Sequence, residues 1–173
     1  QILYAVAIRK PSGERTFRSP SAQDREALEA ANRRFDEVKD GWFATVILPT
    51  EDFPAGNALR PKYYVLDRWI DFYTPRQALV HGTFGEEFAK LIPEVRKELS
   101  SDADDVLFEL ALMQGKALNY NSRLGSWHVS IQVMRSVFER HDFAFQWTFA
   151  EFEGAPAPGS YTNLTLPTHR EVY

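Results

Sequence analysis

The sequence predicts an α+β domain that is mainly α-helical. An N-terminal β-hairpin is followed by a bundle of about four to five helices, with a long irregular connector. Residues 2–9 and 14–19 are the predicted strands, because a Lys-Pro-Ser-Gly turn separates them. Apolar residues recur at helical spacing in several later stretches. Between residues 42 and 73, prolines and glycines interrupt any such period, which predicts the connector.

The first helix is predicted to begin at Ser21, because Asp24 three residues later suits a helix N-terminus, and to end at Asp40-Gly41. Its apolar face contains Ala27, Leu28, Ala31 and Phe35. In the connector, residues 45–48 are compatible with a short strand.

The second helix is predicted to begin at Thr74, an N-cap residue followed by Pro75 at the first helical position. Pro93 either kinks this helix or starts a new one that ends near Ser100. The apolar face of the second helix is expected to contain Leu79, Val80, Phe84, Phe88, Leu91 and Ile92.

A further helix is predicted to begin within residues 101–105, whose acidic side chains suit the positive end of a helix dipole. Gly125 is a predicted break, and Ser130 is the predicted cap of one more helix that buries Ile131, Met134, Val137 and Phe138. The buried stripe of the helix after residues 101–105 is expected to be Val106, Leu110, Met113, Ala117 and Tyr120.

These elements divide the chain into the hairpin with the first helix (1–40), the connector (41–74), the helical core (75–153) and an irregular tail (154–173). We expect one compact domain, because 173 residues can bury a sizeable core. The chain does not begin with Met, so we expect it to be a segment of a longer protein.

The composition limits the classes of function. The chain contains no cysteine, and its apolar runs are shorter than the roughly 20 residues of a membrane span, so we expect a cytoplasmic protein with no membrane partner. The net charge of −4 argues against a freestanding nucleic-acid-binding domain, which is usually basic. A local basic face remains possible, because the acidic residues are partly segregated.

The familiar catalytic motifs are absent from the sequence. There is no phosphate loop, no nucleophile elbow and no paired-histidine metal motif. The four histidines are scattered, and we expect each to be at the surface or locally bonded: His81, His128, His141 and His169. We therefore expect no catalytic, cofactor-binding or metal-binding residue in this chain, and no activity from the chain alone.

The first candidate site is the stretch 68–77, where two arginines and three aromatic residues lie at a predicted helix entrance. Free N–H groups at a helix entrance bind anions, and Arg76 or Arg68 could grip a phosphate. The alternative is structural: Trp69 and Phe72 belong to the core, and the arginines pair with Asp67 or Asp71.

The second candidate site combines Asn121 and Arg123 with Tyr120 and Trp127. Asn and Arg side chains read base edges, whereas Tyr and Trp stack on bases. The alternative is a helix C-terminus in which the Asn side chains and Arg123 satisfy the last carbonyls and Trp127 packs beneath them. The third stretch, residues 143–152, is strongly aromatic and is either one helical turn or an extended segment that packs against apolar partners.

These three stretches also resemble segments of large adenine-specific DNA methylases. The resemblance rests on residues 69–77 (Trp-Ile-Asp-Phe-Tyr-Thr-Pro-Arg-Gln), on residues 120–127 (Tyr-Asn-Ser-Arg-Leu-Gly-Ser-Trp) and on residues 145–151 (Phe-Gln-Trp-Thr-Phe-Ala-Glu). The opening residues 3–6 and the Pro-Ser-Gly turn are similar too. The segments occur in the order found in that family and span most of the chain.

The resemblance implies that the whole protein is an S-adenosylmethionine-dependent amino-methyltransferase with a Rossmann-like catalytic domain. The family's Gly-rich cofactor loop and its Asp/Asn-Pro-Pro-Tyr/Phe motif, which binds the flipped adenine, do not occur here. The resemblance therefore places this chain in an insertion between those two motifs. S-adenosylmethionine is expected to bind elsewhere in the full-length protein.

We expect this chain to bind or position DNA, while the remaining methylase domains of the same polypeptide, its expected partners, perform the chemistry. The alternative is a scaffold that packs on the methylase core without touching nucleic acid. The acidic net charge favours the scaffold, and the resemblance favours the DNA role. The candidate DNA contacts are Arg76, Asn121, Arg123 and Trp127, with Arg68 and Lys62 on phosphates.

Overall fold

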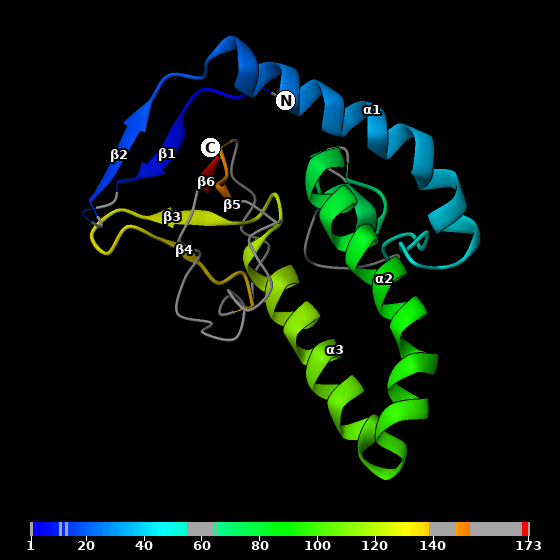
Figure 1. Ribbon diagram of the computed structural model, residues 1–173. Helices are drawn as coiled ribbons and strands as arrows, with labels where there is room; N and C mark the ends of the chain where they lie inside the picture. The colour runs from blue at the N-terminus through cyan, green and yellow to red at the C-terminus, as the bar shows by residue number, and fades with distance from the viewer. Residues whose placement is uncertain are drawn as a thin grey trace.

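A computed structural model of the chain describes residues 2–10, 12, 14–54, 64, 66–138, 148–152 and 171–172. Within these residues the fold is α+β and mainly helical, which confirms the predicted class and the N-terminal hairpin (Figure 1). The predicted bundle of four to five helices is wrong, because the long helices form only two continuous stretches of chain. The first is α1 (Ala22–Ala44), and the second contains α2 (Pro75–Leu99), the 3-10 turn η3 (Ser100–Asp102) and α3 (Ala103–Tyr120).

The strands form two separate antiparallel sheets. The larger has the order β2-β1-β6-β5 and contains β1 (Val6–Arg9), β2 (Arg15–Arg18), β5 (Glu151–Phe152) and β6 (Glu171–Val172). The smaller is a ribbon of β3 (Ser126–His128) and β4 (Val133–Arg135). The N-terminal hairpin is therefore joined by two short strands from the far end of the chain, one of them within the tail predicted to be irregular.

Two predicted elements are wrong. The helix predicted after Ser130 is replaced by the β3–β4 ribbon, because β-branched residues there favour extended backbone, and Gln132 adopts a positive φ of 53° at the turn. The strand predicted over residues 45–48 is a turn, in which Val46 has a φ of 58°. Of the aromatic stretch 143–152, residues 143–147 lie outside the described residues, and only Glu151–Phe152 form a strand.

Helix α1 begins as predicted but ends later. Ser21 accepts a hydrogen bond from the Asp24 N–H, and the Asp24 carboxylate accepts one from the Ser21 N–H, which is a capping box. The helix continues through Gly41 to Ala44, which brings Trp42 into the core. Burial of a Trp side chain outweighs the roughly 1 kcal/mol that a helical glycine costs.

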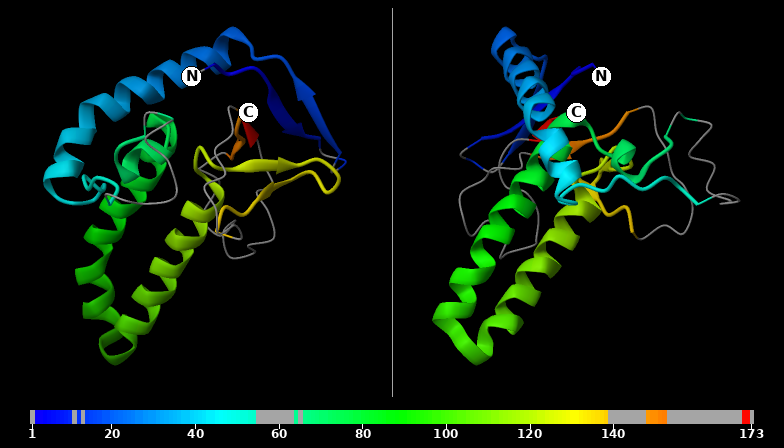
Figure 2. Two further views of the ribbon diagram at one scale, coloured as in Figure 1. Left: turned by 180° about the vertical axis from the view of Figure 1, so that it is seen from behind. Right: turned by 90° about the vertical axis from the view of Figure 1, so that its right-hand side faces the viewer.

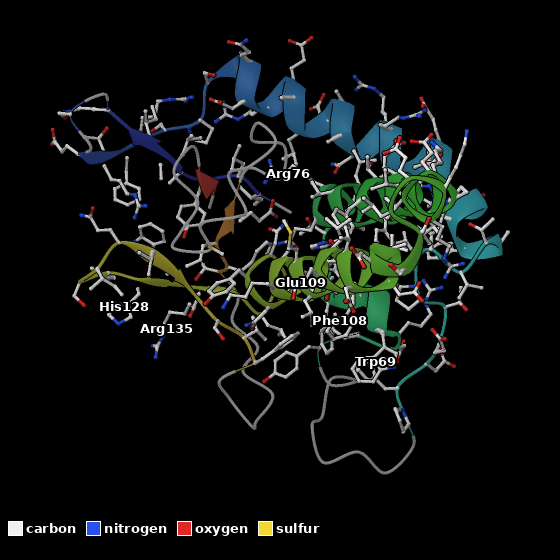
Figure 3. The ribbon with its side chains drawn as sticks, turned by 60° about the horizontal axis from the view of Figure 1, so that its bottom comes forward. Trp69, Arg76, Phe108, Glu109, His128 and Arg135 are labelled. Atoms are coloured by element: carbon white, nitrogen blue, oxygen red, sulfur yellow. The ribbon has the colours of Figure 1, made fainter. Side chains whose placement is uncertain are left out.

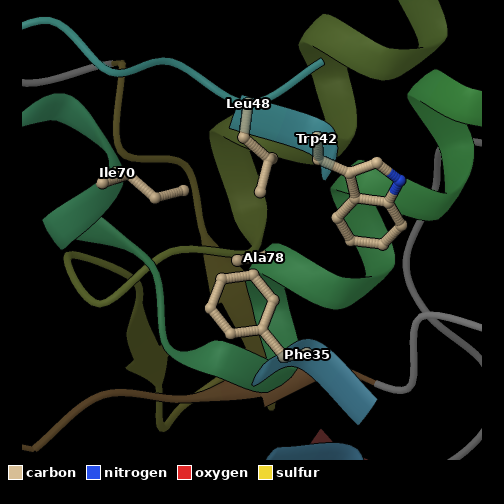
Figure 4. Close-up of a cluster of buried hydrophobic side chains, with 5 residues drawn as sticks. All are labelled: Phe35, Trp42, Leu48, Ile70 and Ala78. Atoms are coloured by element: carbon tan, nitrogen blue, oxygen red, sulfur yellow. The ribbon is translucent and has the colours of Figure 1, made fainter. Parts of the chain in front are cut away.

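The main apolar core lies between α1, α2 and the 3-10 turn η2 (Trp69–Phe72). Its buried members are Phe35, Trp42, Leu48, Ile70 and Ala78 (Figure 4). The Trp42 ring lies directly on α2 at Gly82, where a Cβ atom would be 2.3 Å from the Trp42 Cε3 atom. The Trp42 indole N–H donates to Glu86 at 3.0 Å, so the ring is fixed at both its apolar and polar ends.

Helices α2 and α3 run antiparallel and project away from α1 and the strands as a two-helix arm (Figures 1 and 2). Helix α2 continues through Pro93, and Ser100, with a φ of 47°, lies in the turn that joins the helices. Helix α3 buries Ala103 and Leu107 and exposes Val106, so the predicted stripe is wrong at its first residue; its other predicted members, Leu110, Met113, Ala117 and Tyr120, are half-buried. None of the described helices is long and apolar enough to cross a membrane.

Candidate functional site

The three sequence stretches that carry the family resemblance meet in one place. The N-terminal end of α2, the residues just after α3 and strand β5 lie against each other and are joined by hydrogen bonds. We call this cluster the motif junction; it consists of Thr74, Arg76, Gln77, His81, Asn121 and Glu151. Five of these six side chains are buried, and Arg76 is partly buried.

The entrance of α2 is occupied by a carboxylate from the protein itself. Thr74 is the N-cap, as predicted, and its hydroxyl donates to Glu151 Oε1 at 3.2 Å. The Arg76 guanidinium donates through Nε to Glu151 Oε2 at 2.7 Å and through Nη2 to the same oxygen. Glu151 is only 3% exposed. The anion predicted to bind Arg76 at this helix entrance is therefore an internal one, and neither Asp67 nor Asp71 is its partner.

Asn121 is the C-cap of α3 and is 1% exposed. Its side-chain oxygen accepts a hydrogen bond from Gln77 Nε2 at 3.3 Å. The Gln77 oxygen in turn accepts one from the Thr74 N–H at 3.0 Å, which completes a second capping box at the α2 entrance. In this arrangement Asn121 links two helix ends and is buried, which favours the structural interpretation of this residue.

His81 is the buried end of the same network. Its Nε2 lies 3.0 Å from the Asn121 carbonyl oxygen, and its Nδ1 lies 3.3 Å from Gln114 Nε2. Both contacts suit a neutral imidazole that donates from Nε2 and accepts at Nδ1. Burial lowers the pKa of His81, and the hydrogen bond to Asn121 partly opposes this shift. The prediction of a surface or locally bonded histidine is wrong here, because the partners are distant in sequence.

Arg123 fastens η2 to the end of α3. Its backbone N–H donates to the Phe72 carbonyl at 2.7 Å, and its guanidinium donates to the Asp71 carbonyl at 2.9 Å. Burial lowers the pKa of Arg123, and the Asp71 carboxylate opposes the shift. Arg123 thus satisfies carbonyl groups, as the structural alternative predicts, but they belong to η2 and not to α3.

The two predicted phosphate contacts lie apart from the junction. Arg68 is exposed, with its guanidinium 3.9 Å from the Asp71 carboxylate and 5.9 Å from the centre of the Phe43 ring. Lys62 lies outside the described residues. In this region Trp69 is exposed, and its ring packs at a tilt of 55° against Phe53, with 4.5 Å between ring centres, so the prediction that it belongs to the core is only partly right.

Trp127 lies on β3 between the two ribbons. The Phe17 ring meets it edge-on at 6.1 Å, and the Arg15 guanidinium lies 5.7 Å from the centre of the indole ring. Arg15 and Phe17 were missed as site residues, although alternation along a strand places both on one face of β2. Phe17 is half exposed. Arg15, Phe17 and Trp127 therefore combine an aromatic surface with a cation.

Charge is unevenly distributed between the ribbons and the helices. Residues 2–20 and 121–138, which we call the ribbon end, contain six Arg or Lys residues and one Glu. Residues 21–54 and 66–120, which contain the three helices, hold ten basic and eighteen acidic residues. At the ribbon end, His128 and Arg135 point away from the β1–β2 hairpin, on the outer side of the β3–β4 ribbon (Figure 3). The ribbon end is therefore net basic, and the predicted phosphate contacts Arg68 and Lys62 lie outside it.

Comparison with known protein families, with curated proteins and with solved structures found no match to this chain. The methylase resemblance therefore stays a prediction. Among the described residues, no group of three His, Asp or Glu side chains is arranged to hold a metal ion. The described residues thus form two distinct features: the motif junction, which is buried and internally hydrogen-bonded, and the ribbon end, which is rich in basic and aromatic residues.

Proposed function

We propose that this chain is a non-catalytic, DNA-contacting domain of an S-adenosylmethionine-dependent adenine-specific DNA methyltransferase, and that DNA contacts the ribbon end. The observation that carries the proposal is the separation of charge: the ribbon end contains six basic residues and one acidic residue, although the whole chain is acidic. Clustered Arg and Lys residues are the electrostatic mark of a phosphate-binding surface, even when the whole domain is acidic.

The chemistry of the ribbon end fits this role. Arg135 is exposed on β4, and Arg15 lies over Trp127 beside the half-exposed Phe17. An arginine binds a phosphate with two parallel hydrogen bonds, and an indole ring offers a stacking surface to an unpaired base. Antiparallel ribbons are also narrow enough to enter a groove of duplex DNA.

The proposal reassigns most of the predicted contacts. Trp127 remains a contact candidate, whereas Arg76, Asn121 and Arg123 act as positioning residues, because their polar groups bind other parts of the protein. The buried groups of the motif junction bond to each other, which supports placing the S-adenosylmethionine site in another domain. In the proposed full-length enzyme, the cofactor supplies the methyl group at the separate catalytic domain.

The test is binding of a fluorescent DNA duplex to the chain at about 50 mM salt, where phosphate contacts should still register. We expect weak binding that falls steeply as salt increases, because counterions are released from the DNA. Substituting Arg135→Glu and Arg15→Glu should weaken binding, and each lost phosphate contact should reduce the slope of log affinity against log salt by about one.

The matched control is Arg34→Glu, which makes the same charge change at an exposed position on α1. This variant should bind DNA as the parent chain does. Undetectable binding at low salt, or equal weakening by Arg34→Glu and Arg135→Glu, would contradict the proposed surface.

The scaffold is the second candidate function. It is favoured by the internal bonding of Arg76, Asn121 and Arg123, three of the six predicted DNA contacts. Two results together would favour the scaffold. The parent chain would not bind DNA, and disruption of the motif junction would abolish the activity of the full-length methylase although Arg15 and Trp127 are unchanged.

A further inference from the structure

Helix α3 carries an apolar stripe on a side that no described element covers. Phe108 and Leu112 are 62% and 51% exposed, and Ala111 and Gly115 complete the spacing i, i+3, i+4, i+7. Residues at this spacing lie on one face of a helix. A soluble helix usually turns such a face inward, so the stripe requires a partner.

The surroundings define the extent of the stripe. The side of α3 that contains Ala103 and Leu107 packs on α2, and Phe108 and Glu109 lie at the surface of the arm (Figure 3). At the C-terminal end, the Asn119 side chain accepts hydrogen bonds from the Phe138 N–H at 2.7 Å and from the Ser136 hydroxyl at 3.1 Å. The open part of the stripe therefore runs for about two helical turns before residues 136–138 close it.

We propose that the stripe is a self-association surface, on which two copies of this chain pair through antiparallel α3 helices. The steric pattern supports this occupant. In an antiparallel pair centred between Ala111 and Leu112, Phe108 of one copy lies opposite Gly115 of the other. A Cβ built on Gly115 has no neighbouring atom within 4 Å, so the glycine leaves open space in the stripe for a large side chain.

Charge complementarity also selects the antiparallel arrangement. Asp105, Glu109 and Lys116 lie along one edge of the stripe, at the spacing i, i+4, i+11. In antiparallel helix pairs, each edge of one helix meets the same edge of the other. Lys116 of one copy therefore lies beside Asp105 and Glu109 of its partner, and the symmetry forms this contact twice. A parallel pair would bring opposite edges together, so Lys116 would not face Asp105 or Glu109, and Phe108 would lie against Phe108.

The size of the surface sets the expected strength. Two turns of helix on each copy make a small interface, which is typical of a weak and reversible dimer. We expect the 19.9 kDa chain to sediment as a monomer when dilute and to approach twice that mass at about 100 μM.

Analytical ultracentrifugation of designed variants tests the proposal. Phe108→Glu should weaken the dimer by more than about tenfold, because it removes the large apolar side chain that packs on Gly115 of the partner copy and places a charge there. Gly115→Leu should also abolish dimerisation, while circular dichroism shows at least the parent helix content, because leucine favours a helix more than glycine does. Loss of the dimer in this variant therefore cannot result from unfolding.

A charge swap identifies the occupant and its orientation. Lys116→Glu should weaken the dimer several-fold. Adding Glu109→Lys in the same chain should restore part of the lost affinity, because positions 116 and 109 again carry opposite charges while Asp105 stays acidic. The control is Val129→Glu, which removes an exposed apolar side chain from the β3–β4 turn and should leave dimerisation unchanged. A monomer at every concentration, a dimer unaffected by Phe108→Glu, or no rescue by the double swap would overturn the proposal.

Discussion

Helix α2 is held on two sides by different kinds of contact. Toward α1 the contact is mainly apolar and close, with the Trp42 ring resting on Gly82 and one hydrogen bond from its indole N–H to Glu86. Toward α3 and β5 the contact is the motif junction, in which Gln77 and His81 bond to Asn121, and Arg76 bonds to Glu151. One helix thus has an interface determined by shape and another determined by hydrogen bonding.

The difference matters because the two contacts fail in different ways. An apolar contact loses stability in proportion to the volume that is misplaced, and it does not respond to pH. A buried polar network is stable only when all its members are paired, because each unpaired group retains its full cost of removal from water. We therefore expect the motif junction to be the more sensitive to a single substitution.

The largest effect is expected from Arg76→Ala, which leaves the Glu151 carboxylate buried without its cation. The free energy of unfolding should fall by about 3 kcal/mol, near the lower end of the range for breaking a buried ion pair. Urea denaturation measures this change. The control is Arg34→Ala, which breaks an exposed pair with Glu37 on α1 and should change stability by less than about 1 kcal/mol.

A double variant tests whether the loss of stability in Arg76→Ala comes from the unpaired Glu151 carboxylate. Because the cost of Arg76→Ala arises from the unpaired carboxylate, adding Glu151→Leu should recover most of the lost stability. Equal effects of Arg76→Ala and Arg34→Ala would show that the Arg76–Glu151 pair does not stabilise the junction.

The apolar contact is tested by a pair of glycine substitutions. Gly82→Ala should destabilise the fold by about 1–3 kcal/mol, because the new methyl group overlaps the Trp42 ring. Gly41→Ala, with nothing within 4 Å of its new Cβ, should instead stabilise the helix by up to about 1 kcal/mol. Thermal unfolding of both variants checks the opposite signs. Stabilisation by Gly82→Ala would mean that Trp42 does not pack on α2 as described.

The smallest effect is a pH dependence that arises from His81 in the motif junction. The pKa of His81 is lower in the folded chain than its usual value near 6.5 in an unfolded chain, so the unfolded state binds the proton more readily. The contribution of neutral His81 to the free energy of unfolding is fully present above about pH 6.5. It is lost as the pH falls toward the pKa of His81 in the folded state. In His81→Gln, the urea concentration at the unfolding midpoint should change less between about pH 7.5 and pH 5 than it does in the parent chain. An unchanged pH profile in His81→Gln would exclude His81 as the source.

Much of the local structure followed from the sequence. Ser21 with Asp24, and Thr74 with Pro75, marked the starts of α1 and α2, because capping depends on side chains within one turn. The Lys-Pro-Ser-Gly turn between β1 and β2 was equally local. The ends of elements were less predictable: α1 passes Gly41 because Trp42, one residue further, gains a place in the core.

The buried face of α2 shows why the candidate site was only partly predictable. Periodicity selected the apolar residues from Leu79 to Ile92, whereas the buried residues are Gln77, Ala78, His81 and Gly82. Three of these are polar or lack a side chain, so no hydrophobic pattern reveals them. Their burial depends on partners such as Asn121 and Glu151, which are distant in sequence.

By itself, the sequence determined the mixed fold class, the helix starts, the N-terminal hairpin and the three stretches that combine Arg, Asn and aromatic residues, because each of these depends on neighbouring residues. Only the tertiary structure decided that parts of the three stretches form one internal junction, that Arg15 and Phe17 meet Trp127, and that no described element covers the stripe on α3. The physical reason is that burial and pairing are properties of contacts between distant segments. The same Arg or Asn side chain binds a ligand or a neighbouring helix according to which of them the fold places within hydrogen-bonding distance.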